Sequence, residues 1–84
     1  MEKFDRLLMQ ILSGSSDVNI RFSDLCQLLR NMGFDERIRG SHHIFRKAGI
    51  EEKINPQKDN DKAKPYQIRQ VRNVIVEYHL EGDI

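Results

Sequence analysis

The sequence predicts an α+β protein in which helices pack on one face of a three-stranded antiparallel sheet. Its length of 84 residues suits one small hydrophobic core and is too short for two. Apolar residues repeat with a helical period in three segments, and with a period near two between the second and the third. Glycine, serine and proline mark the breaks between these segments.

Two helices are expected in the first part of the chain. The first has apolar residues at the spacing i, i+3, i+4, i+7, namely Phe4, Leu7, Leu8 and Ile11. It ends at Ser13-Gly14-Ser15-Ser16. The second carries the stripe Leu25, Leu28, Leu29 and Met32. Ser23 or Asp24 is available as its N-cap, and Gly33 as its C-terminal stop.

Three strands are expected next, because the apolar period changes toward two at Phe34. Residues 34–39 and 42–46 predict two short strands around Gly40-Ser41, and such a tight connection indicates an antiparallel hairpin. Ala48-Gly49 marks a second turn. A third strand is expected over residues 50–54, before Asn55-Pro56 breaks it.

The last part of the chain predicts a polar loop followed by a helix. Residues 57–64 have no apolar period and are expected to form an exposed loop. Pro65 occupies a position where a first-turn proline is tolerated. The helix that it opens has Ile68, Val71, Ile75 and Tyr78 on one face.

The composition indicates a soluble globular protein, with a hydrophobic fraction of 38% and a charged fraction of 32%. No apolar run approaches the roughly 20 residues that a bilayer helix needs. The mixed charges of residues 1–6 are unlike a secretory signal peptide. We therefore expect a cytoplasmic protein with no membrane partner. Cys26 is the only cysteine, and we expect a small buried side chain rather than a nucleophile.

The adjacent histidines His42 and His43 are the first candidates for chemistry. Neighbouring side chains on a strand point to opposite faces, and His79 lies at the far end of a helix, so no metal ligand set is expected. A histidine near arginines and lysines can transfer protons while an anionic substrate is held. RNA carries its own nucleophile, the 2′-hydroxyl, so such a site needs no cofactor. The alternative is two ordinary strand residues, and each face of the strand has one large apolar residue.

Basic residues form two zones on a chain whose net charge is only +1. Residues 36–50 and residues 62–80 each carry four basic and one acidic side chain, and they could form one patch in the fold. Lysines beside a helix N-terminus suit a phosphate. The alternative is two ordinary solvated faces. The residues expected to hold RNA are Arg39, Ser41, Arg46, Lys47, Lys62, Lys64, Arg69 and Arg72.

Two segments make the sequence similar to a known family. The second helix, ending in Gly33-Phe34 and followed by Arg39-Gly40-Ser41-His42-His43-Ile44-Phe45, resembles the signature of the HicA toxins. Ala63-Lys64-Pro65-Tyr66-Gln67-Ile68-Arg69-Gln70-Val71-Arg72 is similar to the closing helix of a longer subgroup. The resemblance makes residues 1–84 one domain, with its core in residues 20–80 and a helical extension in residues 1–19.

The resemblance implies a fold like that of a double-stranded-RNA-binding domain and a metal-independent endoribonuclease that cleaves mRNA. It also implies a HicB-type antitoxin as partner, covering the catalytic histidine. By position His42 is that histidine and His43 the second candidate. Many relatives have a further histidine after the third strand, where this chain has Asn55-Pro56-Gln57. A non-catalytic RNA-binding module and a protein-interaction domain are the alternatives, and the chain alone is expected to be a monomer.

Overall fold

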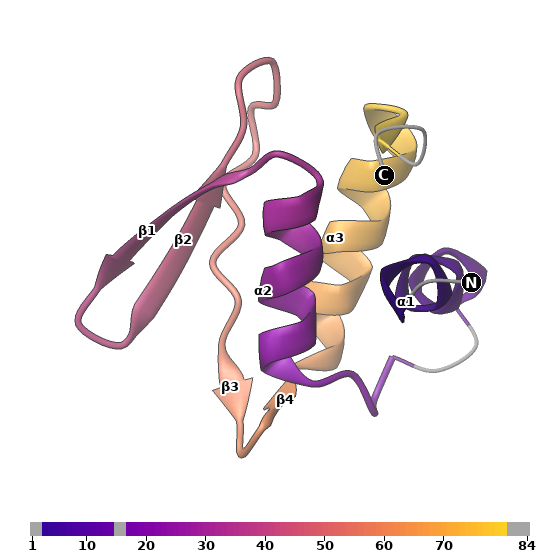
Figure 1. The fold of residues 1–84 in the computed structure, drawn as a ribbon, viewed down its shortest axis with the longest axis horizontal. Helices are drawn as coiled ribbons and strands as arrows, with labels where there is room; N and C mark the ends of the chain where they lie inside the picture. Colours follow the sequence, from indigo (N-terminus) through magenta and orange to yellow (C-terminus); the bar gives the residue numbers. More distant parts are fainter. Residues whose placement is uncertain (1–2, 15–16, 81–84) are drawn as a thin grey trace.

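Three helices and two short hairpins form the described part of the chain, residues 3–14 and 17–80 of a computed structural model (Figure 1). In chain order they are α1 (Lys3–Ser13), α2 (Phe22–Asn31), β1 (Asp35–Arg39), β2 (His42–Arg46), β3 (Lys58–Asp59), β4 (Lys62–Ala63) and α3 (Pro65–Glu77). The predicted α+β class is confirmed. Ser15 and Ser16, part of the predicted first break, lie outside the described residues.

The three apolar stripes form the core that was predicted for them. One cluster joins Leu7, Leu8 and Ile11 of α1 with the stripe of α2 and the apolar side chains of α3, while Phe4 and Tyr78 are partly buried against it. The helix α2 lies between the β1–β2 hairpin and α3 in Figure 1. No helix within the described residues is both long and apolar enough to cross a bilayer.

The start of α2 differs from the prediction of a side-chain cap. Arg21, rather than Ser23 or Asp24, is the N-cap, and its side chain makes no capping hydrogen bond. The backbone N–H of Phe22 instead donates to the carbonyl of Asp61 at 2.9 Å. A distant segment therefore satisfies one of the first amides of the helix, which have no partner within it. The predicted stop is confirmed, because Gly33 has a φ of +90° just after the helix.

The predicted hairpin is confirmed, and the predicted third strand is wrong as a strand. β1 pairs antiparallel with β2, and Gly40 at a φ of +59° opens the two-residue turn. Beyond β2, Ile54 alone among the described residues pairs with this sheet, in an isolated bridge to Phe45. A turn at Gly49, closed by the bond from the Ile50 amide to the Lys47 carbonyl, redirects the chain. The sheet therefore has two strands, without the third strand of a double-stranded-RNA-binding domain.

Residues 57–64, which were expected to form an exposed loop, contain a second small hairpin. β3 pairs with β4 around Asn60, whose φ of +59° is one that asparagine tolerates. The backbone N–H of Ala63 donates to the carbonyl of Ile20 at 2.9 Å. This bond and the bond to Asp61 tie the small hairpin to the start of α2.

Arg72 of α3 fastens the N-terminal helix to the rest of the fold. Its Nε donates to the carbonyl of Ile11 at 2.6 Å, in the last turn of α1. Its guanidinium also pairs with Asp17, and both side chains are mostly buried. An arginine at a helix C-terminus satisfies free carbonyls and favours the helix dipole. Arg72 therefore has a structural role that the sequence did not suggest.

Replacing Arg72 by methionine is expected to lower the free energy of unfolding by about 1–3 kcal/mol, because a mostly buried carboxylate loses its partner. Urea unfolding followed by circular dichroism measures this change. Arg69→Met on the same helix is the matched control, since Arg69 is exposed and should change stability by less than about 0.5 kcal/mol. Equal midpoints for the two variants would contradict the structural role of Arg72.

Candidate functional site

The two faces of the β1–β2 hairpin carry different side chains. Phe45 has no exposed surface, and it defines an inner face toward the helices that also holds Glu36 and His43. The outer face carries His42, whose cross-strand partner is Arg39. His42 is exposed, whereas His43 is half-buried, with 25% of its side chain accessible. The structure thus decides the orientation that the sequence left open.

The outer face of the hairpin is strongly basic beside His42. A broad hollow of about 640 Å³ opens on it, and its basic lining comes from Arg37, Arg39, Arg46 and Lys53. Asp35 and Glu36 are the acidic residues of that lining. Four cations around one hollow form a surface that attracts a phosphate backbone, and Arg39 among them is the cross-strand partner of His42. Arg37 and Lys53 were not among the predicted RNA-binding residues.

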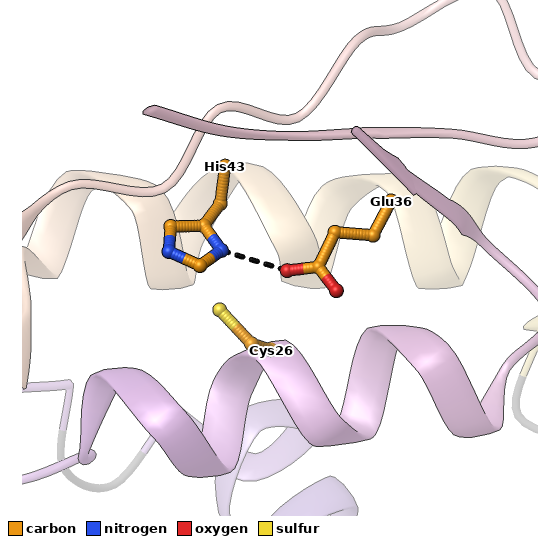
Figure 2. A group of neighbouring side chains, drawn as sticks. All are labelled: Cys26, Glu36 and His43. Atoms are coloured by element: carbon orange, nitrogen blue, oxygen red, sulfur yellow. Dashed lines mark hydrogen bonds and ion pairs between the residues drawn. The ribbon is translucent and has the colours of Figure 1, made fainter. Parts of the chain in front are cut away.

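On the inner face, three charged or polar side chains form a chain of hydrogen bonds. Arg30 of α2 holds both carboxylate oxygens of Glu36, with Nε–Oε1 at 2.7 Å and Nη2–Oε2 at 3.0 Å. Nδ1 of His43 lies 2.7 Å from Oε2 of the same carboxylate (Figure 2). The hydrogen bond from Arg30 lowers the pKa of Glu36, so its carboxylate is ionised. Because an ionised carboxylate only accepts, Nδ1 of His43 is the donor.

A second hollow, of about 370 Å³, lies at the tip of this hairpin. Ser41, His42 and His43 line it from the hairpin, and Lys58 lines it from β3. The ring of His43 meets that of Phe22 edge-on at 5.2 Å, and Nζ of Lys58 lies 5.5 Å from the centre of the same Phe22 ring. Both histidines therefore border one space, although their side chains leave the strand on opposite faces.

The far wall of this hollow is held by a buried glutamine of α3. Gln67 is only 3% exposed. Its amide accepts from the N–H of Gln57 and donates to the carbonyl of Asn55. These bonds fix the segment that runs from Ile54 to β3 against α3. The hollow is therefore bounded by β2 and by this backbone segment, which Gln67 fixes to α3.

Cys26, Glu36 and His43 place a sulfur, a carboxylate oxygen and a ring nitrogen within 4.8 Å of one another (Figure 2). These are ligand types that zinc accepts, and no residue spacing indicates that they lie close together. Arg30 already occupies both carboxylate oxygens, however, and its positive charge opposes a cation. Burial raises the pKa of the Cys26 thiol to about 11, which disfavours the thiolate that zinc binds. The arrangement fits a hydrogen-bonded histidine better than a metal centre.

The structure brings together only some of the predicted RNA-binding residues. Arg39, Ser41 and Arg46 lie on the hairpin with His42. Lys47 donates instead to the carbonyl of Met32 at 2.9 Å, near the end of α2. The others belong to β4, to the N-cap of α3 or to α3 itself: Lys62, Lys64, Arg69 and Arg72.

The α3 part of the second basic zone is separated in space from the hairpin zone. The helix α3, which carries Arg69 and Arg72, lies across α2 from the β1–β2 hairpin in Figure 1. Arg72 is also used internally, in its contacts with α1. The hairpin zone is therefore the basic surface that adjoins the histidines, and Lys58 is an addition to it that the sequence analysis missed.

The fold and the site define a class of small α+β proteins in which a hairpin with adjacent histidines lies beside α2, on the side away from α3. A family model described as HicA toxin of bacterial toxin-antitoxin matches residues 22–76, and the chain belongs to this family. The match runs from the first residue of α2 into α3, and α1 lies outside it. HicA family toxins are mRNA interferases and pair with antitoxins. No curated protein and no solved structure was found to match the chain.

Proposed function

We propose that this chain is a metal-independent endoribonuclease that cleaves mRNA, with His42 transferring a proton at the scissile phosphodiester. The observation that carries the proposal is the position of His42. Its imidazole is exposed on the basic outer face of the hairpin, opposite Arg39, and no side chain in the described ranges hydrogen-bonds to it. It is therefore free to meet a substrate that this face attracts.

The chemistry required of the protein is modest. The 2′-hydroxyl of RNA attacks the adjacent phosphorus, and the 5′-oxygen of the next nucleotide leaves. An imidazole can take or give the proton in this exchange, because its ordinary pKa is close to neutral. Arg39 and Arg46 would hold the phosphate backbone beside it and offset charge that develops on the phosphoryl oxygens.

The test is cleavage of a long transcript by purified protein in the presence of a chelator. We expect products with 2′,3′-cyclic phosphate and 5′-hydroxyl ends, because the 2′-hydroxyl is the nucleophile. The same transcript with 2′-O-methyl groups is the matched control and should remain intact. Cleavage of the methylated transcript would contradict the mechanism. Salt-dependent binding of RNA without cleavage would contradict the enzyme and favour the non-catalytic RNA-binding module.

We also propose that a HicB-type antitoxin neutralises the chain by covering the exposed His42. The support is that the proposed proton-transfer group lies on an open face, where another protein can reach it. Adding such an antitoxin to the cleavage reaction should therefore stop it and should protect the hairpin amides from hydrogen exchange. Inhibition without protection of the hairpin would contradict this mode of neutralisation.

A further inference from the structure

One edge of β2 is open where the second hollow lies. Phe45 exchanges both of its backbone hydrogen bonds with Ile54, at 2.7 and 3.0 Å, so its N–H and C=O point away from β1. Backbone groups two residues apart in an antiparallel strand point to the same edge. The N–H of His43 therefore points away from β1 as well. Ile54 is the last residue to pair at this edge in the described part of the chain, so this N–H faces the hollow unpaired.

The side chains of His42 and His43 flank this edge from opposite faces of the strand. Both line the same hollow of about 370 Å³. In phosphoryl transfer the attacking and leaving oxygens lie roughly in line on opposite sides of phosphorus. A base and an acid for such a reaction must therefore lie on opposite sides of the phosphate. Adjacent residues on one strand meet that requirement when the phosphate lies beside the strand edge.

We propose that the scissile phosphate of RNA binds at this open edge, with His43 as the general base and His42 as the general acid. This inference rests on the proposed ribonuclease function and deepens it. Nε2 of His43 takes the proton of the 2′-hydroxyl while the 2′-oxygen forms its bond to phosphorus. The bond from phosphorus to the 5′-oxygen breaks, and His42 gives that oxygen a proton. The products are a 2′,3′-cyclic phosphate and a 5′-hydroxyl, and the two histidines exchange protonation states.

The environment of His43 assigns it the role of base. Nδ1 carries the proton that is donated to Glu36, so in the neutral ring Nε2 has a free lone pair. Figure 2 shows Nε2 on the side of the ring away from Glu36. When Nε2 accepts a proton, the carboxylate stabilises the imidazolium that forms. Arg30 holds the carboxylate in place, so Glu36 acts as a positioning residue.

The hollow also offers groups for the phosphate itself. The unpaired N–H of His43 can donate to a non-bridging oxygen, as backbone amides do in oxyanion holes. Lys58 lines the same hollow, and its Nζ lies 5.5 Å from the centre of the Phe22 ring. Its charge can therefore approach a phosphate that lies between the two histidines.

The decisive experiment uses two RNA substrates that differ in one atom, the 5′-oxygen or a 5′-sulfur at the scissile bond. A thiolate leaves without help from an acid, because the pKa of a thiol is only about 8.5. His42→Asn should lose about 10²–10⁴-fold in kcat on the oxygen substrate and should recover most of this on the sulfur substrate. His43→Gln should lose a similar factor on both substrates, because its missing base acts on the 2′-hydroxyl. Recovery by His43→Gln alone, or by neither variant, would overturn the assignment.

Glu36→Gln tests the positioning role separately. We expect kcat to fall about 10- to 100-fold, with KM nearly unchanged, as for other carboxylates that orient a functional histidine. Nitrogen-15 NMR should show the proton of the neutral His43 ring on Nδ1 in the wild type and shared between both nitrogens in the variant. A urea midpoint for each variant separates loss of folding from loss of positioning. An unchanged tautomer in folded Glu36→Gln would overturn the role of Glu36.

The outcomes distinguish this inference from the proposed function. If the wild-type protein cleaves neither substrate, the ribonuclease proposal itself fails. If the wild type cleaves both and His43→Gln matches it on the oxygen substrate, the ribonuclease stands and the two-histidine mechanism fails. The NMR measurement needs no substrate, so it reports on Glu36 and His43 in either case.

Discussion

His42→Asn is expected to lower the rate of RNA cleavage by about 10²–10⁴-fold, the usual contribution of one proton-transfer group. Asparagine keeps a polar side chain on the exposed strand but cannot transfer a proton at neutral pH. His42 is exposed and makes no hydrogen bond with the described side chains, so the free energy of unfolding should change little. The measurement is the initial rate of transcript cleavage in chelator, together with a urea midpoint for each protein.

His79→Asn is the matched control for this experiment. His79 is exposed beyond the end of α3 and has a φ of +54°, which asparagine tolerates. It lies outside the hairpin and lines none of the hollows that border the hairpin. The control should therefore cleave at the wild-type rate. Equal rates for His42→Asn and the wild type would remove His42 from the mechanism and leave its place on the basic face as a binding role only.

The sequence predicted correctly those helices and turns that depend on residues close together in the chain. The stripe from Leu25 to Met32 has the period of a helix, and its side chains are buried as predicted. Gly40 and Pro65 mark a turn and a helix start, because each has a backbone preference that fits only a few positions. These features depend on neighbours within a few residues, so a single sequence carries them.

The predictions were wrong for two segments whose conformation depends on contacts with residues far away in the sequence. Residues 50–54 were predicted as a strand between a turn and Asn55-Pro56, yet only Ile54 pairs with the sheet, because the turn at Gly49 redirects the chain before it. Residues 57–64 have no apolar period, but bonds from Phe22 and Ala63 order them against the start of α2. Asn60 has a positive φ, and its flanking aspartates are also turn-forming residues, so the sequence did contain a local indication of a turn there.

The candidate site could be predicted in part for the same reason. A glycine turn and two histidines are visible in the sequence, and the alternation of a strand places their side chains on opposite faces. The choice of face could not be predicted, because Ile44 and Phe45 are both large and apolar. The hydrogen bonds that Glu36 accepts from Arg30 and from His43 link a helix and a hairpin, and no residue spacing in the sequence indicates them.

The inner face of the hairpin is anchored mainly by one side chain, and this gives the largest expected effect on stability. Phe45 has no exposed surface, whereas Ile38 on the same face is 58% exposed, since it lies nearer the tip. Phe45 also carries the bridge to Ile54, which starts the segment along the second hollow. Its removal should therefore loosen the hairpin together with the edge of β2 that borders the second hollow.

Phe45→Ala is expected to lower the free energy of unfolding by about 3–5 kcal/mol, the usual cost of removing a buried phenylalanine. A chain of this length has a total of about 4–13 kcal/mol, so the substitution would remove a large fraction of its stability. Urea unfolding by circular dichroism measures the change, and the cleavage rate should fall with the folded fraction. Ile38→Ala is the control, with an expected change within about 0.5 kcal/mol because its side chain is mostly exposed. If the two variants had equal midpoints, the hairpin would be held to the helices by contacts other than Phe45, such as the pairing of Arg30 with Glu36.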